Sequence, residues 1–272
     1  MAKTIFITGA SRGFGKIWAE AFLKRGDQVV VTARNTDSLK DLVDRYGDAV
    51  LSLKLDVNNR ADSFAAVARA KEHFGHIDVL INNAGYGLFG AIEENTEEEA
   101  RAQIETNVFG LLWLTQAIVP VMREQGSGHI IQVSSVLGIT TLPLLGLYNA
   151  SKFAVEGLTE SLAAEVKGFG IQVSLLEPNG FATDWAGDSA NHSAHMAIYD
   201  QLRADFEAGT TEDSFGLPEA TAEAVLQLVD AKNPPLRLFL GKVALPWVKQ
   251  VYADKLATWE AWSDVSAKAH GH

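Results

Sequence analysis

A tyrosine and a lysine in the segment YNASKF have the chemistry and spacing of a proton-transfer pair. Tyr148 and Lys152 are four positions apart, so on a helix both side chains project from one face. A phenol has an ordinary pKa of about 10, too high for ready proton exchange near neutrality, and a neighbouring ammonium lowers it. A packed tyrosine beside a surface lysine has the same pattern, so the context decides. Here Ser135 lies thirteen positions before the tyrosine, after a strand-like run, and Asn107 lies in an earlier helix-like segment.

A glycine cluster in ITGASRGFGK predicts a second site, for phosphate. Gly9, Gly13 and Gly15 follow an apolar run and precede a segment with helical spacing. A helix N-terminus offers free N–H groups and a partial positive charge to an anion. We expect Gly9 to allow the tight turn, Gly13 the close approach of a phosphate, and Gly15 the packing of the helix on the strand. A plain strand–helix turn is the alternative reading of the cluster alone.

The end of the second strand-like run indicates which dinucleotide would bind. The segment VTARN has Ala33 where a carboxylate would hydrogen-bond the ribose hydroxyls of NAD, and Arg34 follows it. Arg12, within the glycine cluster, adds a second cation. Guanidinium groups pair well with a 2′-phosphate, so this corner favours NADP(H) over NAD(H). Solvated surface arginines are the alternative interpretation.

Alternating short apolar runs and helix-period segments must position these residues. Such alternation predicts an α/β fold, a Rossmann-like doubly wound sheet of seven parallel strands with helices on both faces. No linker divides the chain, so we expect a single dinucleotide-binding catalytic domain over residues 1–272. A polar stretch, 184–217, is expected to form a substrate lid, and mixed charges in a C-terminal helical segment, 242–269, favour packing or subunit contact. The strand-like runs are 4–8, 28–33, 49–56, 78–83, 128–134, 171–178 and 236–241.

Composition narrows the function classes. The chain has 272 residues, a formal net charge of -11 and no cysteine. Acidity argues against nucleic-acid or anionic-membrane binding, and the missing thiols exclude disulfides and cysteine chemistry. No apolar run looks long enough to cross a bilayer and no secretory signal is visible, so we expect a cytoplasmic protein. We expect no metal site: surface positions explain His192 and His195, and helix-start electrostatics explain the glutamates at 93–99.

These motifs together resemble the short-chain dehydrogenase/reductase family, over about residues 4–183. The match includes Thr8 with the glycine cluster, the NNAG motif that begins at Asn82, and the tyrosine–lysine pair. The segments NNAGYGLFGAIEE, GSGHIIQVSSVLG and NPPLRLFLG are similar to the family's hydroxysteroid-dehydrogenase-like branch. Family members often form homodimers or homotetramers through helices that correspond here to 96–124 and 148–168. Asn179 departs from the usual Pro-Gly turn; asparagine tolerates the left-handed conformation, so we expect the turn to survive.

The resemblance assigns roles to particular residues. It implies a catalytic tetrad of Asn107, Ser135, Tyr148 and Lys152, in which the asparagine is expected to anchor a proton-relaying water. Asp56 is expected to meet the adenine amino group, and Thr183 the nicotinamide carboxamide. The expected NADP-binding residues are Gly9, Ser11, Arg12, Gly13, Phe14, Gly15, Arg34, Asp56, Val57, Asn83, Ala84, Gly85, Tyr148, Lys152, Pro178, Gly180 and Thr183.

The implied reaction transfers hydride between NADP(H) and a carbonyl/alcohol pair, with the tyrosine as acid or base. Apolar and aromatic residues near the nicotinamide end are expected to form the substrate wall: Tyr86, Leu88, Leu142, Leu144 and Trp185. They favour a bulky hydrophobic ketone, aldehyde or alcohol. A non-catalytic NADP(H)-binding sensor or scaffold is the main alternative, and the intact tetrad argues against it. A serine hydrolase would need a G-x-S-x-G elbow around Ser135, which the chain lacks; an isomerase or lyase on the same scaffold stays open.

Overall fold

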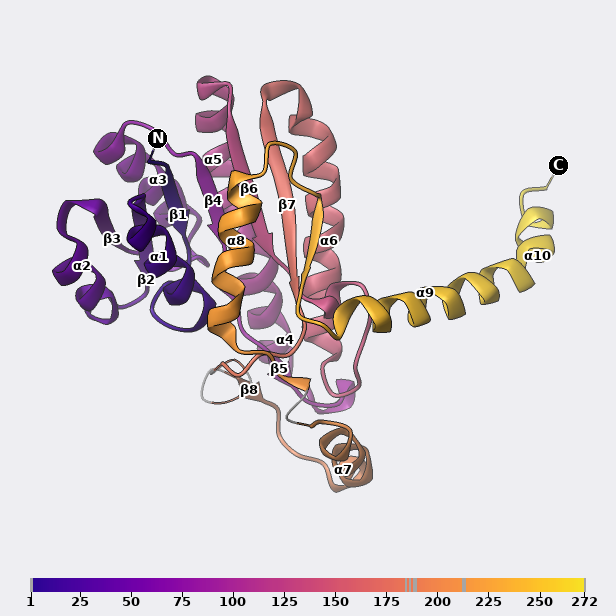
Figure 1. The fold of residues 1–272 in the computed structure, drawn as a ribbon. Helices are drawn as coiled ribbons and strands as arrows, with labels where there is room; N and C mark the ends of the chain where they lie inside the picture. The colour runs from indigo at the N-terminus through magenta and orange to yellow at the C-terminus, as the bar shows by residue number, and fades with distance from the viewer. Residues whose placement is uncertain (1, 184, 186, 188–189, 212–213, 272) are drawn as a thin grey trace.

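The computed structural model describes residues 2–183, 185, 187, 190–211 and 214–271. Within them, seven parallel strands form the central sheet in the order β3-β2-β1-β4-β6-β7-β9 (Figure 1). Each coincides with a strand predicted from the sequence, so the predicted sheet is confirmed. The strands are β1 (Thr4–Ile7), β2 (Gln28–Ala33), β3 (Val50–Lys54), β4 (Val79–Asn82), β6 (Gly128–Val133), β7 (Ile171–Pro178) and β9 (Arg237–Leu240); β5 (Leu88–Phe89) and β8 (Asn191–His192) form a separate small sheet.

Helices connect the strands and cover both faces of the sheet (Figure 1). The helices are α1 (Gly13–Arg25), α2 (Lys40–Tyr46), α3 (Arg60–Phe74), α4 (Glu97–Ile104), α5 (Leu111–Gln125), α6 (Gly146–Val166), α7 (Asp200–Ala208), α8 (Thr221–Asp230), α9 (Ala244–Ala261) and α10 (Ser263–Lys268). A π-helical turn, Glu105–Gly110, joins α4 and α5 into one continuous stretch.

Successive residues of the central strands enter different cores. Ile5 and Ile7 join the apolar cluster of α1, α2 and α8, whereas Phe6, between them, joins the cluster of α3, α5 and α6. Both faces of a parallel strand are therefore buried, which explains why these strands are apolar almost throughout. Trp18 of α1 is fully buried, and its indole N–H donates to Thr221 Oγ1 of α8 at 2.8 Å. That bond satisfies the polar atom of the largest side chain in the core.

The strand order places a crevice above the centre of the sheet. Chain connections run outward on one side from β1 to β2 and β3, and on the other from β4 to β6, β7 and β9. Loops at the carboxyl ends of β1 and β4 therefore diverge, and ligands of open α/β sheets bind at such a point.

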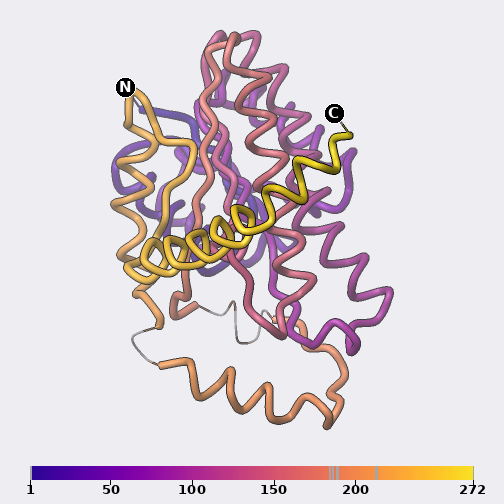
Figure 2. The backbone as a smooth tube through the Cα atoms, turned by 90° about the vertical axis from the view of Figure 1, so that its right-hand side faces the viewer, coloured from indigo at the N-terminus to yellow at the C-terminus, as the bar shows by residue number. Residues whose placement is uncertain are grey.

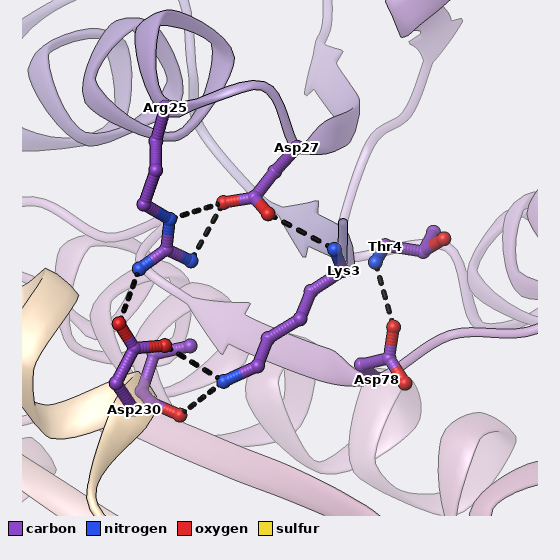
Figure 3. A network of polar contacts seen from close by, with 7 residues as sticks. Lys3, Thr4, Arg25, Asp27, Asp78 and Asp230 are labelled. Atoms are coloured by element: carbon purple, nitrogen blue, oxygen red, sulfur yellow. Dashed lines mark hydrogen bonds and ion pairs between the residues drawn. The ribbon is translucent and has the colours of Figure 1, made fainter. Parts of the chain in front are cut away.

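The opposite edge of the sheet, where the strands begin, is held by charges (Figure 3). Lys3 Nζ and Arg25 both pair with Asp230 at 2.9 Å, and Arg25 also pairs with Asp27 at 2.6 Å. The Thr4 N–H donates to Asp78 Oδ2 at 2.7 Å. This network joins the start of β1 to the ends of α1 and α8, away from the crevice, so its role is structural.

One helical stretch passes the length and composition criteria for a membrane span. Glu97–Gln125, which runs through α4, the π-helical turn and α5, is long and apolar enough. The expectation that no stretch reaches this length is therefore wrong. Leu114 and Ile118 of α5 are fully buried against Val67 of α3, so core packing accounts for the apolar residues of this stretch.

The two C-terminal features predicted from the sequence differ in outcome. The helical segment at 242–269 is present as α9 and α10. In the predicted lid, residues 190–211 contain β8, a 3-10 turn (Ala197–Tyr199) and α7, and Arg203 of α7 forms an ion pair with the buried carboxylate of Glu94. Residues 184, 186, 188, 189, 212 and 213 of that segment lie outside the described part of the chain, and closure of the lid stays a prediction.

Candidate active site

A cavity of about 1040 Å³ lies at the carboxyl ends of the strands. Loops after β1, β2, β3 and β4 form one end of it, and loops after β6 and β7 form its middle. α7 and the first turn of α9 complete the far end. The cavity is thus at the crevice that the strand order requires, and it is large enough for a dinucleotide and a substrate together.

The glycine loop has the conformations predicted for it. Gly9 (φ 65°) and Gly13 (φ 53°) both occupy the left-handed region. A Cβ on Gly13 would meet nothing within 4 Å, so the backbone there is open to a ligand. A Cβ on Gly15 would lie 2.6 Å from Asn83 Nδ2 and would also collide with the Gly9 carbonyl, so Gly15 is a packing position. The loop fits a phosphate at the N-terminus of α1.

Thr8 and Asn83 fix this loop to the end of β4. The Thr8 hydroxyl oxygen accepts hydrogen bonds from the N–H groups of Asn83 and Ala84, each at 2.9 Å. In return the Asn83 side-chain amide donates to the Thr8 and Gly9 carbonyls, at 2.9 and 3.2 Å. A Cβ on Gly9 would come within 3.0 Å of Ala84 Cα. The two loops form a single rigid wall.

The predicted adenosine corner carries two exposed cations. Arg12 and Arg34 both line the cavity, and within the described residues neither guanidinium has a hydrogen bond or an ion pair. Neighbouring Lys16, by contrast, pairs with Asp41 at 2.8 Å. Asp56 also lines the cavity and accepts a hydrogen bond from the Asn58 N–H at 3.1 Å. Ser11, Phe14 and Val57 also line this end.

Tyr148, in the first turns of α6, lies on the floor of the cavity and is 5 % exposed. Burial raises the pKa of its phenol, and the hydrogen bond with Ser135 acts in the opposite direction. The expected lowering of this pKa by Lys152 is not seen. The Lys152 ammonium is 5.7 Å from the centroid of the tyrosine ring, and burial of the phenol dominates the shift. The four-residue spacing of Tyr148 and Lys152 correctly predicts that they lie on one face of the helix. It does not predict that the phenol is buried, and burial determines the direction of its pKa shift.

Lys152 is buried one turn further along α6. Its ammonium donates to the Val133 carbonyl at 2.8 Å, and the side chain is 7 % exposed. Burial lowers the pKa of Lys152 to about 8, although Glu156, one turn further, favours the charged form. A lysine near neutrality can give or take a proton beside the phenol.

A cluster of carboxyl groups lies behind Lys152. Glu156 of α6 and Glu177 of β7 are both buried, and Arg237 of β9 lies within 3.0 and 3.1 Å of them. The same guanidinium reaches exposed Glu160 at 2.8 Å. Burial and the neighbouring Glu156 raise the pKa of Glu177 to about 8. One guanidinium faces three carboxyl groups, so burial and the repulsion between Glu156 and Glu177 favour a proton on that pair.

Asn107 holds one wall of the cavity through hydrogen bonds to the backbone of Tyr86. It lies in the π-helical turn, a feature frequent at functional sites. Its side chain accepts from the Tyr86 N–H and donates to the Tyr86 carbonyl, both at 3.1 Å, and it also donates to Ser151 Oγ. These bonds hold the loop after β4 against α6. The water-anchoring role expected from the resemblance stays a prediction.

The substrate end of the cavity is apolar, but two of the leucines predicted to line it lie elsewhere. Tyr86, Leu142 and Trp185 line the cavity, and Trp185 packs on Tyr148 with ring centroids 4.8 Å apart. Leu88 and Leu144 are 2 % and 7 % exposed and lie outside the lining. Each neighbour one position on, Phe89 and Leu145, lines it instead. Adjacent residues of the strand Leu88–Phe89 face opposite sides, and Leu144 lies in a turn with positive φ, so in both places an error of one position exchanges wall for core.

Sequence reasoning missed the part of the wall that comes from distant segments. These residues are Leu202 and Phe206 of α7, Phe215, and Val243 and Trp247 at the start of α9. Trp247 lies in the C-terminal helical segment predicted at 242–269, but nothing local to it indicates that α9 begins beside the cavity.

The turn after β7 also differs from its prediction. Among the described residues, Leu144 is the one non-glycine with positive φ, so Asn179 does not use the left-handed conformation. Its N–H donates to the Leu240 carbonyl at 3.0 Å and extends the pairing with β9. A Cβ on Gly241 would collide with its side chain, so Gly241 makes room for the asparagine. Pro178, Gly180 and Thr183 line the cavity as expected.

The histidines of the lid segment have partners other than metal. His192 stacks on Phe89 at 5.1 Å, and His195 pairs with Asp200 at 2.6 Å. In the part of the chain that the structure describes, no three His, Cys, Asp or Glu side chains are grouped to hold a metal ion. Thr96 and Glu99 form the capping box that accounts for part of the acidic run at 93–99.

Comparison with known proteins identifies the class to which this site belongs. The family described as short chain dehydrogenase matches residues 3–194, a span that includes the glycine loop, Lys152 and Thr183. The chain therefore belongs to this family and is an oxidoreductase by relationship.

Particular relatives cover almost the whole chain. Oxidoreductase BOA17 of Botryotinia fuckeliana is 39% identical over 98% of both chains. A 3-ketodihydrosphingosine reductase of Bacteroides thetaiotaomicron is 38% identical and covers 94% of this chain and 92% of its own. A crystal structure of a short-chain dehydrogenase from Streptomyces avermitilis superposes with a TM-score of 0.90 at 37% identity, over 98% of both chains. Neither named relative is a hydroxysteroid dehydrogenase, so the family is shown but not that branch.

Solved relatives bind nicotinamide cofactors of both kinds. A short chain dehydrogenase/reductase from Burkholderia phymatum, in complex with NAD, has a TM-score of 0.82 at 27% identity, over 94% of this chain and 95% of its own. ElxO with NADP bound has a TM-score of 0.76 at 26% identity, over 90% of this chain and 100% of its own. The choice between the two cofactors must come from this chain's own residues.

Proposed function

We propose that the protein is an NADP(H)-dependent oxidoreductase that interconverts a bulky hydrophobic ketone or aldehyde and the corresponding alcohol. One observation carries the proposal: Tyr148 is buried beside Ser135 and Lys152 on the floor of the cavity that the glycine loop opens into. A non-catalytic dinucleotide-binding protein would need the loop but no buried proton donor.

The residues present fit a dinucleotide with a 2′-phosphate. Gly13 leaves backbone open at the N-terminus of α1, where a pyrophosphate is favoured, and Gly9 allows the tight turn that precedes it. Ala33 occupies the position at which a carboxylate would hydrogen-bond the ribose diol of NAD. The unpaired guanidinium groups of Arg12 and Arg34 line the same end of the cavity. A phosphate would give both cations an ion-pair partner, and this supports NADP(H) over NAD(H).

Three side chains would handle the proton and the oxygen. The bound nicotinamide supplies or accepts a hydride. Tyr148 gives its phenol proton to the carbonyl oxygen in reduction and takes it back in oxidation. Ser135 donates a hydrogen bond to the same oxygen as charge develops on it. Lys152, with its pKa lowered to about 8, lies one helical turn from the phenol and can exchange protons with it near neutrality.

The wall of the cavity supports a hydrophobic substrate. Trp185, Phe206 and Trp247 come from three separate segments and surround the space above Tyr148. The relative named 3-ketodihydrosphingosine reductase acts by its name on a ketone of a long alkyl chain, which is the same substrate class. Apolar surfaces of this kind select for apolar area rather than for a sugar or a charged acid.

The test follows the absorbance of NADPH and of NADH with a panel of long-chain, steroidal and aromatic ketones. NADPH should be consumed with at least one of them. Arg34→Ala should weaken NADPH binding by about 10- to 100-fold and leave NADH binding nearly unchanged, because a charge-assisted bond to the phosphate is lost. Equal affinities for the two cofactors, or NADPH binding without turnover of any ketone or alcohol, would contradict the proposal.

A further inference from the structure

The last two helices leave the body of the protein. α9 extends outward from the end of β9 and is followed by α10, as Figure 1 shows at the right of the molecule; in Figure 2 both helices lie in front of the body, on the viewer's side. Only its first half contacts the body: Ala244 is fully buried, Trp247 lines the cavity, and Lys255 donates to the Ile139 carbonyl at 3.2 Å. From Leu256 onward every described residue is exposed. We call residues 244–268 the arm.

One side of the arm is apolar. Tyr252, Leu256, Trp259 and Trp262 are 42%, 49%, 60% and 64% exposed. They are separated by three or four positions. The same series extends back to Val248, which packs against the body, and to Leu245, which is 49% exposed. Spacing of three and four keeps side chains in a narrow seam along a helix, the arrangement by which one helix packs on another. Aromatic side chains of this size are seldom left in water in such a row.

The charges beside the seam favour a second copy of the same helix. At about 100° per residue, Lys249 and Glu260 lie on the same edge of the seam, separated by nearly whole turns. In a two-fold antiparallel pair of identical helices, the same edges face each other. A pair centred between residues 254 and 255 therefore places Lys249 of each copy opposite Glu260 of the other, twice. Parallel pairing would lose this complementarity and would also align the helix dipoles unfavourably.

We propose that the arm is a dimerisation element, which pairs antiparallel with the arm of a second copy of this chain. This surface is separate from the helices at 96–124 and 148–168, through which the family resemblance predicts association. In the proposed register, Trp262 of one copy lies level with Trp247 of the other. The tip of each arm thus comes to the mouth of its neighbour's cavity, and burial of both seams removes the exposed aromatic rings from water.

A membrane surface fits the arm less well. An interfacial helix carries many cations opposite a wide apolar face, whereas the face of α9 opposite the seam has Asp254, and the first turn of α10 has Asp264. The whole chain has a net charge of -11, which an anionic bilayer repels.

The test measures the mass of the full chain by light scattering during gel filtration, at micromolar concentration. Trp259→Glu places charges in the seam and should halve the mass, whether the wild type is a dimer or a tetramer. Circular dichroism should stay unchanged, because Trp259 is 60% exposed and lies beyond Lys255, where the arm last bonds to the body. The emission of the tryptophans should move to longer wavelength as the mass falls. A monomeric wild type, or an unchanged mass in this variant, would overturn the proposal.

Charge exchange tests the antiparallel register. Lys249→Glu and Glu260→Lys, made singly, should each weaken association by about tenfold, because they place like charges opposite each other at two symmetric positions. The double variant should restore the wild-type dissociation constant. Asp254→Lys is the matched control: it changes the charge as much as Glu260→Lys does, but on the face away from the seam, and should have no effect. Failure of the double variant to recover would contradict the register.

Other occupants of the seam give different outcomes. Flotation with vesicles of anionic phospholipid should leave the protein unbound. Binding to the vesicles, lost in Trp259→Glu while the mass stays that of a monomer, would replace the proposal with a membrane-surface role.

Discussion

The two halves of the cavity are built from different parts of the chain. In the cofactor half, the wall is main chain at the ends of neighbouring strands, with Gly13 open to the ligand, Gly9 packed against Ala84, and Thr8 bonded to the loop after β4. In the substrate half, the wall is apolar side chains such as Trp185 and Phe206, brought in by segments outside the main sheet.

This difference indicates where the protein can change and where it cannot. A main-chain wall depends on the course of the strands, so a change there costs stability as well as binding. A side-chain wall can be altered one residue at a time without disturbing the sheet. We therefore expect substitutions in the first half to impair binding or chemistry with any substrate, and those in the second to change which substrate is used.

Tyr148→Phe should have the largest effect, because Tyr148 lies where the halves meet. Loss of the phenol proton should lower kcat about 10²–10⁴-fold with every substrate. NADPH affinity should change little, since the ring is kept. Tyr86→Phe removes another phenol from the same cavity and should lower kcat by less than about tenfold. Steady-state rates and fluorescence titration with NADPH measure both. Turnover of Tyr148→Phe close to that of the wild type would end the assignment of this residue as the proton donor.

Thr8→Val tests the main-chain wall. The change keeps the shape of a side chain that is 1 % exposed but leaves the N–H groups of Asn83 and Ala84 without an acceptor. Each buried orphan costs about 1–3 kcal/mol, so the free energy of unfolding should fall by about 2–4 kcal/mol and NADPH should bind more weakly. Thr8→Ser keeps the oxygen and should lose much less. Urea denaturation of the two variants gives the comparison; equal losses would mean that the methyl group, not the bonds, is what matters.

Trp185→Ala tests the side-chain wall and should have a smaller, selective effect. The indole packs on Tyr148 and Phe89, at 4.8 and 5.5 Å between centroids, without a bond to the glycine loop. KM for a bulky ketone should rise about tenfold, because apolar contact area is lost, while KM for a small ketone and the affinity for NADPH stay nearly constant. A loss of NADPH affinity with no change in KM would show that this tryptophan belongs to the cofactor half.

The same contrast explains what the sequence could predict. The seven strands and the glycine loop were accessible because apolar periodicity and glycine spacing are local properties, and Gly9, Gly13 and Gly15 adopt the expected conformations or contacts. The substrate wall was only partly accessible. Leu88 and Leu144 were assigned one position away from Phe89 and Leu145, which line it, because the facing of a two-residue strand or a strained turn is set by tertiary contacts.

The sequence also does not reveal which side chains become buried or which distant segments reach the cavity. Phe206 and Trp247 reach the cavity from segments far along the chain, which no local pattern reveals. The predicted direction of the Tyr148 pKa shift was wrong for a related reason. The spacing of two residues on a helix predicts their proximity, whereas the shift depends on how much of the surrounding protein excludes water.

The carboxyl cluster behind Lys152 should have the smallest effect of these, because it acts on the cofactor half only through the pKa of Lys152 and contacts no ligand itself. Burial lowers the pKa of Lys152 to about 8, and Glu156 opposes that shift. If the ammonium is the active form, kcat/KM should fall as the pH rises through about 8. Glu156→Gln removes the charge that favours the ammonium, so this alkaline limb should move to lower pH, by less than about one unit. Glu160→Gln, which removes an exposed partner of the same Arg237, should leave the limb in place. A limb that moved to higher pH, or equally in both variants, would show that the cluster supports the fold and does not act on Lys152.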